Sequence, residues 1–134
     1  MPAVFIGLPV TDVDRATAFY TAVGFDINPM FTDHNAACFT VDEDHTYLMA
    51  ISRDFFQSMS NLPIGDNAVS PSVSVTVYRD SRDAVDATAE AGLAAGGAEP
   101  QPADDYGFMY TRQVNDPDGN VIQFGWMDPA GPQS

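Results

Sequence analysis

No side chains in this sequence stand in a spacing that clearly predicts nucleophilic or acid–base chemistry. His34 and His45 are the two histidines, and both lie in polar stretches between apolar segments, where neither is expected to act as a base. Cys38 lies in an apolar run, which is typical of a small buried side chain and not of an activated thiolate. Asp104 and Asp105 are adjacent, so on a strand they would point to opposite faces and could not share a proton.

The composition excludes several classes of function. The chain of 134 residues has no lysine, so Schiff-base catalysis is excluded. Its 19 acidic residues and net charge of −14 would repel nucleic acid and attract a cationic ligand. No apolar run approaches the ~20 residues that a membrane span needs, and no signal peptide is visible. With a single cysteine, these features predict a cytoplasmic protein that binds neither nucleic acid nor membranes.

The first half of the chain predicts a strand, a helix and three further strands. Residues 4–10 alternate in the manner of a strand. Its apolar face comprises Val4, Ile6, Leu8 and Val10. Thr11 or Asp12 can cap the helix that follows, and Gly24 can end it. The three strands expected next cover residues 25–31, 36–41 and 46–52.

The second half repeats this order of elements. Residues 53–69 interrupt the pattern, and we expect one or two helical turns and a linker there. Residues 72–77 then alternate between polar and apolar side chains, which predicts a strand. Ser81 can cap a second helix, which Gly96 and Gly97 close. The remaining strands are expected at residues 98–102, 107–114 and 121–127.

The repeat predicts an α+β fold in which two βαβββ modules form a single domain over residues 1–134. Each helix should pack on one face of its sheet and leave the other face free to line a cleft. The parts are a first module at about 1–52, a linker at 53–69, a second module at about 70–128 and a short tail at 129–134.

Four short segments carry a resemblance to a known family. They are Gly7-Leu-Pro-Val-Thr-Asp12, Ala18-Phe-Tyr20, Gly24-Phe25 and Asp116-Pro-Asp-Gly-Asn120, which leads into Val-Ile-Gln-Phe124. In this order, over nearly the whole chain, they resemble the vicinal oxygen chelate superfamily, which includes glyoxalase I, extradiol dioxygenases and bleomycin-resistance proteins. The resemblance implies the two-module fold and a homodimer, because clefts in single-chain-length members often form across subunits.

The resemblance also implies four positions for metal ligands, and this chain departs from the family at all of them. Metal-dependent members have histidine or glutamate there, whereas the corresponding residues here are Phe5, Met49, Ser72 and Gln123. A divalent transition metal needs imidazole nitrogen, carboxylate or thiolate ligands. A shift of one residue along each strand supplies no such ligand either. We therefore expect no metal and no cofactor.

Aromatic and neutral polar side chains on the predicted strands suggest a pocket for a small molecule. An apolar cleft with a few polar groups is the usual composition of such a site. The candidate ligand-binding residues are Phe5, Tyr47, Met49, Ser72, Ser74, Tyr106, Phe108, Tyr110, Arg112 and Gln123. The alternative interpretation is that the later aromatic residues form the core of the sheet.

The function that these observations favour is non-catalytic binding of a small, cationic or aromatic molecule in a metal-free cleft. Resistance proteins that sequester a cationic antibiotic offer the model. One alternative is a lyase, isomerase or dioxygenase of the same superfamily that holds a metal with atypical ligands. Another is a structural or regulatory dimer whose cleft is filled by its own side chains.

Overall fold

A computed structural model describes residues 3–43 and 45–132, so the ends of the chain and Asp44 lie outside the described residues. The first module contains β1 (Val4–Val10), α1 (Val13–Ala22), β2 (Asp26–Ile27), a 3-10 turn η1 (Pro29–Phe31), β3 (Ala36–Asp42) and β4 (Thr46–Ser52). Its sheet has the order β1-β4-β3-β2, in which β1 and β4 are parallel and the other neighbours antiparallel.

The second module repeats this topology. After α2 (Arg53–Ser58) and the linker come β5 (Ser74–Tyr78), α3 (Arg82–Ala94), β6 (Asp104–Asp105), β7 (Met109–Gln113) and β8 (Val121–Met127). Its sheet has the order β5-β8-β7-β6, with β5 and β8 parallel. The predicted fold class of two βαβββ modules is confirmed.

The helices begin where side-chain capping was expected. Asp12 accepts hydrogen bonds from the backbone N–H groups of Asp14 and Arg15, at 2.9 and 3.2 Å, and so opens α1. The Ser81 hydroxyl accepts from the backbone N–H of Ala84 at 3.0 Å and opens α3. These local bonds satisfy donors that the first helical turn leaves free, which fixes each helix start independently of tertiary packing.

Two predicted strands differ from expectation for reasons of backbone chemistry, since one is shorter and the other does not form. In 25–31, Asn28 caps the turn that starts at Pro29, so β2 stops at Ile27. In 98–102, Pro100 and Pro102 have no N–H to donate to a neighbouring strand. Only an isolated bridge between Ala98 and Asn115 forms there, and β6 lies farther along the chain.

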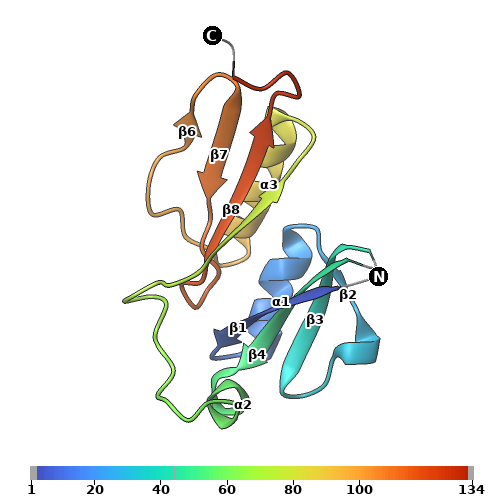
Figure 1. Ribbon diagram of the computed structural model, residues 1–134, viewed down its shortest axis with the longest axis vertical. Coiled ribbons are helices and arrows are strands. Elements are labelled where there is room, and N and C mark those ends of the chain that lie inside the picture. The colour runs from blue at the N-terminus through green and yellow to red at the C-terminus, as the bar shows by residue number, and fades with distance from the viewer. Residues whose placement is uncertain (1–2, 44, 133–134) are drawn as a thin grey trace.

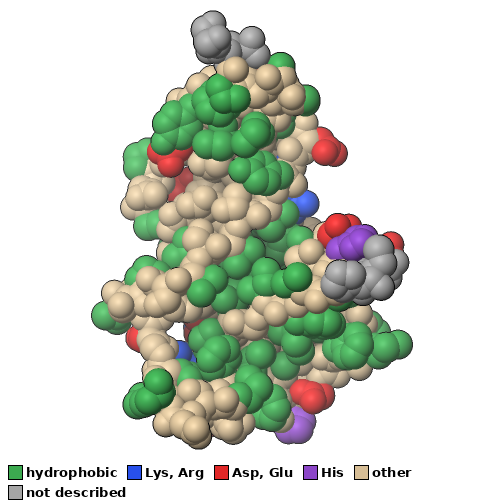
Figure 2. Space-filling view, in the orientation of Figure 1, with side chains coloured by type: hydrophobic (Ala, Val, Ile, Leu, Met, Phe, Trp, Pro, Cys, Tyr) green, Lys and Arg blue, Asp and Glu red, His purple; other side chains and the backbone are tan. Residues whose placement is uncertain are grey.

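The two sheets stand one above the other, with α1 and α3 behind them in the view of Figure 1. Helices α1 and α3 each cover one face of their own sheet. On the opposite face of the first sheet, Phe56 of α2 lies near Gly7, and helices α1 and α3 do not cover that face. We call this opposite face the open face of each module. It turns toward the viewer in Figures 1 and 2.

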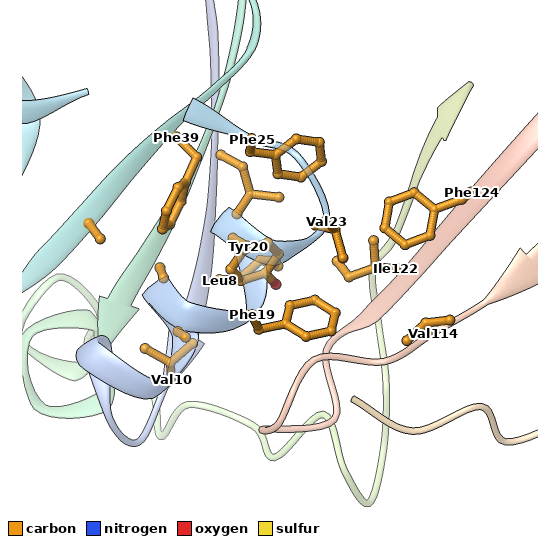
Figure 3. Close-up of a cluster of buried hydrophobic side chains, with 14 of the residues drawn as sticks. Leu8, Val10, Phe19, Tyr20, Val23, Phe25, Phe39, Val114, Ile122 and Phe124 are labelled. Atoms are coloured by element: carbon orange, nitrogen blue, oxygen red, sulfur yellow. The ribbon is translucent and has the colours of Figure 1, made fainter. Parts of the chain in front are cut away.

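One hydrophobic core joins the two modules. Phe19 of α1 and Val23, which follows that helix, point toward Ile122 and Phe124 of β8, as Figure 3 shows, and all four are buried. Because they share this core, the modules are expected to unfold together. In the parts of the chain that the structure describes, no helix has the length and apolar character needed to cross a membrane.

Candidate ligand-binding faces

The open face of the first module presents a cluster of aromatic rings. Phe5 on β1 lies opposite Tyr47 on β4, and their rings stack with centroids 4.7 Å apart and planes 15° apart. Phe31 meets Phe5 edge-on at 5.7 Å. Phe5 is 46% exposed and Phe31 48% exposed. Aromatic rings that stay half-exposed in an ordered cluster are typical of a surface that binds something.

The open face of the second module is polar but uncharged at its centre. Ser74 on β5 lies opposite Val121, and Thr76 lies opposite Gln123 on β8. The Thr76 hydroxyl donates a hydrogen bond of 3.2 Å to the Gln123 side-chain oxygen. Thr76 is exposed and Gln123 partly exposed. These groups can donate and accept hydrogen bonds without carrying charge.

The expectation that Tyr110 and Arg112 line a cleft on the open face is wrong in its choice of face. They lie on the helix-covered face, opposite Trp126 and Phe124 of β8. The Tyr110 hydroxyl donates to Asp86 of α3 at 2.6 Å. Tyr110 and Arg112 share one face of β7, as the alternation predicts, but which face the helix covers depends on packing.

Tyr106 and Phe108 also lie outside the two open faces. They precede β7, in the connection from β6, where Tyr106 N–H donates to the Met109 carbonyl oxygen. Tyr106 is 60% exposed and Phe108 is partly buried. Together with Gly107 and Asp128 they line a separate surface cavity.

An ion-pair network occupies the helix-covered face of the second module. Arg112 donates to Asp86, Glu90 and Glu99, with the three closest N–O distances between 2.9 and 3.2 Å. Hydrogen bonding to these carboxylates raises the pKa of Arg112, and the guanidinium in turn lowers the pKa of Glu99. The spacing of Asp86 and Glu90, one helical turn apart, was the available sequence signal for this network.

Arg82 forms a second part of this face. Its guanidinium lies 5.0 Å from the Tyr110 ring centroid and 5.2 Å from that of Trp126. It also binds Asp105 through two hydrogen bonds of 2.8 Å, which hold the pKa of that carboxyl well below its usual range. Tyr110 and Trp126 thus serve the packing between sheet and helix.

Arg112→Gln is therefore expected to lower the free energy of unfolding by about 1–3 kcal/mol and to leave ligand binding unchanged. The Arg112 side chain is 11% exposed, and its removal leaves three neighbouring carboxylates without their shared cation. Chemical denaturation measures the loss. Arg53→Gln, which removes the same charge from outside this network, is the control and should cost less. Equal losses in both variants would contradict the structural role of Arg112.

A buried polar cluster ties the Asp-Pro-Asp-Gly turn to the first module. Tyr20 of α1 donates its hydroxyl hydrogen to Asp116 at 2.7 Å, and the Asn120 side chain donates to the same carboxylate oxygen at 2.8 Å. Asn120 also donates to the Pro9 carbonyl oxygen at 3.0 Å. Burial raises the pKa of Asp116 and, with the nearby carboxylate, that of Tyr20. The cluster is saturated with internal partners, which indicates a structural role.

Comparisons with known proteins agree with this topology. Residues 3–42 match a protein family described as bleomycin resistance protein-like N-terminal. Among solved structures, a glyoxalase-related enzyme from Fulvimarina pelagi has a TM-score of 0.78 at 20% identity, covering 94% of this chain and 88% of its own. A hypothetical protein from S. aureus has a TM-score of 0.78 at 22% identity, covering 94% of both chains.

A glyoxalase/bleomycin resistance protein/dioxygenase family enzyme from Burkholderia phytofirmans PsJN has a TM-score of 0.75 at 17% identity. This match covers 92% of the present chain and 96% of the other. The fold is that of the vicinal oxygen chelate superfamily. The resemblance noted in the sequence is thereby confirmed. No curated protein matches the chain.

The strand register of the superfamily fold corrects one of the four ligand positions. Phe5 pairs with Tyr47, two residues before Met49, and Ser74 pairs in the same way with Val121, two residues before Gln123. Ser74 thus corresponds to Phe5 by position. Ser72, the residue expected there, is exposed and precedes β5. Both candidates are serines, so the chemistry available at this position does not change.

These four residues do not fit the metal that the superfamily fold implies. The phenyl ring of Phe5 has no donor atom, Met49 offers a thioether, and Ser74 and Gln123 offer neutral oxygens. Within residues 3–43 and 45–132, no three side chains among His, Cys, Asp and Glu come together where they could hold a metal ion. Cys38, across from Met49, is buried, and burial raises its pKa.

Proposed function

We propose that the protein is a homodimer that binds a small aromatic molecule against its open faces, without a metal ion, without a cofactor and without catalysis. The observation that carries this proposal is the exposed aromatic cluster of Phe5, Tyr47 and Phe31. A flat ring can extend that stack, and each offset-stacked pair contributes about 0.5–1.5 kcal/mol beyond burial of its area.

A second copy of the chain supplies the other wall of the cleft. Four surface cavities in the described part of the chain are lined by residues other than Phe5 and Met49. In a dimer, the open face of one copy's second module would cover the aromatic cluster of the other copy. Ser74, Thr76 and Gln123 would then give hydrogen bonds to the ligand's polar edge.

The residues at the four superfamily positions support binding over catalysis. Phe5, Met49, Ser74 and Gln123 include no group that titrates near neutral pH, and general acid–base catalysis needs one. The net charge of −14 favours a cationic aromatic ligand through long-range attraction. Sequestration of a cationic antibiotic in a cytoplasmic resistance protein is one form of this function.

Calorimetric titration with indole, a neutral aromatic compound, and benzamidine, a cationic one, tests the proposal. We expect saturable binding of at least one of them, weakened by about tenfold in Phe5→Ala. The control is Phe55→Ala, because Phe55 is 42% exposed on α2 and contributes nothing to the aromatic cluster. Its affinity should equal that of the unaltered protein, and light scattering should report a dimer.

Three results would contradict the proposal. The first is one tightly held metal ion per chain, measured by mass spectrometry after re-equilibration with Ni²⁺, Zn²⁺, Fe²⁺ or Mn²⁺. It would favour a metal-dependent lyase, isomerase or dioxygenase with atypical ligands. A dimer that binds neither aromatic compound would favour a structural role with a self-filled cleft. A protein that stays monomeric at all concentrations would lack the second wall of the proposed cleft.

A further inference from the structure

A polar cavity of about 130 Å³ lies at the end of β1 that is farthest from the aromatic cluster. Pro9, in its wall, follows Phe5 by four residues, or about 13 Å along the strand. The cavity is lined by Pro9, Thr11, Arg53, Asp66, Asn67, Asp118 and Asn120. Figure 2 shows a gap in the surface with acidic and basic atoms at its edge, where the linker of Figure 1 passes the first module.

The linker is held close to the Asp-Pro-Asp-Gly turn, which gives the cavity a defined wall. The Asn67 side chain donates a hydrogen bond to the Asn120 side-chain oxygen. Gly119 permits the close approach, because a Cβ there would lie 2.7 Å from the Cα of Ala68. Its φ of +83° also lies in the region that favours glycine.

Asp118, in the wall of this cavity, has one carboxylate oxygen without a hydrogen-bond partner among the described residues. Its Oδ1 accepts hydrogen bonds from Thr11 N–H at 2.9 Å and from Arg15 at 3.1 Å. Its Oδ2 is buried and has no hydrogen-bond partner among the described residues, and the side chain is 9% exposed. A buried carboxylate with an unpartnered oxygen is costly, so a positive charge placed in the cavity beside Asp118 would be stabilised. Asp66 adds a second carboxylate to the lining.

Arg53 brings the opposite charge to the same cavity. Its Nη2 donates to the Gly65 carbonyl oxygen at 3.1 Å. Neither Asp118 nor Asp66 forms an ion pair with Arg53 within 4.0 Å, judged over residues 3–43 and 45–132. The cavity therefore has carboxylates and a guanidinium in its lining that do not neutralise each other directly.

We propose that this cavity binds a small zwitterion, of the size of glycine or alanine, with its ammonium group at Asp118 and Asp66 and its carboxylate at Arg53. An apolar protein cavity of about 150 Å³ accepts benzene, so 130 Å³ suits a molecule of about five or six non-hydrogen atoms. A lone cation would be repelled by Arg53, and a lone anion by the two carboxylates. A zwitterion meets both charges, with its ammonium group beside the carboxylates and its carboxylate beside the guanidinium.

Titration with glycine, followed by calorimetry, tests the site. Methylamine and acetate, which each carry one half of the zwitterion, are the matched ligands. We expect saturable glycine binding, with a dissociation constant no tighter than a few micromolar for so few atoms, and much weaker binding of either half. Asp118→Asn and Arg53→Gln should each weaken glycine binding by about tenfold or more.

The variants are chosen so that folding and binding can be separated. Asp118→Asn keeps the oxygen that accepts from Thr11 and Arg15 and replaces Oδ2 with an amide donor. Asp54→Asn removes the same charge from the exposed first turn of α2 and should bind glycine normally. Circular dichroism verifies the fold of each variant. If Asp118→Asn does not fold, Arg53→Gln and Asp66→Asn carry the test.

Several outcomes would overturn this assignment. They are absence of saturable glycine binding, equal affinity for methylamine or acetate, unchanged affinity in Arg53→Gln, and preferential binding of Ca²⁺. The aromatic ligands tested against the open faces serve as an independent control. If the protein binds indole or benzamidine but not glycine, the glycine site is contradicted and the proposed function still stands.

Discussion

Phe19→Ala is expected to lower the free energy of unfolding by about 3–5 kcal/mol, the usual cost of removing a buried phenyl ring. Phe19 is fully buried and packs edge-on against Tyr20, with ring centroids 5.0 Å apart. It also points from α1 toward the second module, so its loss opens a cavity where the two modules meet. Because both modules share this core, they should unfold together in the variant as in the unaltered protein.

Urea denaturation followed by circular dichroism measures this effect. Phe55→Ala removes the same ring from a residue that is 42% exposed on α2, and it should cost less than about 1 kcal/mol. Two separate transitions in the unaltered protein, or equal losses in the two variants, would show that Phe19 does not join the modules.

Asp116→Ala is expected to cost about 3–5 kcal/mol, because it breaks a buried network and leaves several donors without partners. Asp116 is 2% exposed. It accepts from the Tyr20 hydroxyl, the Asn120 side chain and the backbone N–H groups of Asp118 and Asn120. Tyr20→Phe removes one of these bonds and keeps the packing, so it should cost about 1–2 kcal/mol.

The pH dependence distinguishes this role from simple loss of packing. Burial raises the pKa of Asp116 above 3.8, so the stability that this proton linkage contributes is fully present below 3.8 and is lost as pH rises through the folded pKa. The difference in unfolding free energy between the unaltered protein and Asp116→Ala should therefore shrink as pH rises from about 4 toward neutrality. Asp54→Ala, at an exposed position, is the control variant and should cost much less than Asp116→Ala. A difference that grows with pH would contradict the raised pKa.

Alternation and capping residues predicted those helices and strands whose ends are set by residues nearby in the sequence. The strand at Val4–Val10 has the extent that its alternation predicts, and Ser81 begins α3 as expected. The strand expected at 98–102 did not form, because two prolines there removed the donors that pairing requires. That signal was present in the sequence and could have been used.

The candidate site was predicted only in part. Phe5, Tyr47 and Met49 share one open face, and Ser74 and Gln123 share the other, as alternation within each strand implied. Tyr110 and Arg112 were placed on the wrong face, because alternation says which residues share a face and not which face the helix covers. Asp86 and Glu90 were overlooked, although they decide where Arg112 lies.

The sequence by itself determined the two-module fold, its capped helices and the neutral residues at the superfamily's ligand positions. These follow from residue type, periodicity and motif spacing, all of which are local properties of the chain. Only the tertiary structure decided that Tyr110 and Arg112 face helix α3 and that Asp118 and Arg53 line one cavity. Those facts depend on contacts between residues that are far apart in the chain, where packing and the pairing of buried polar groups select the arrangement.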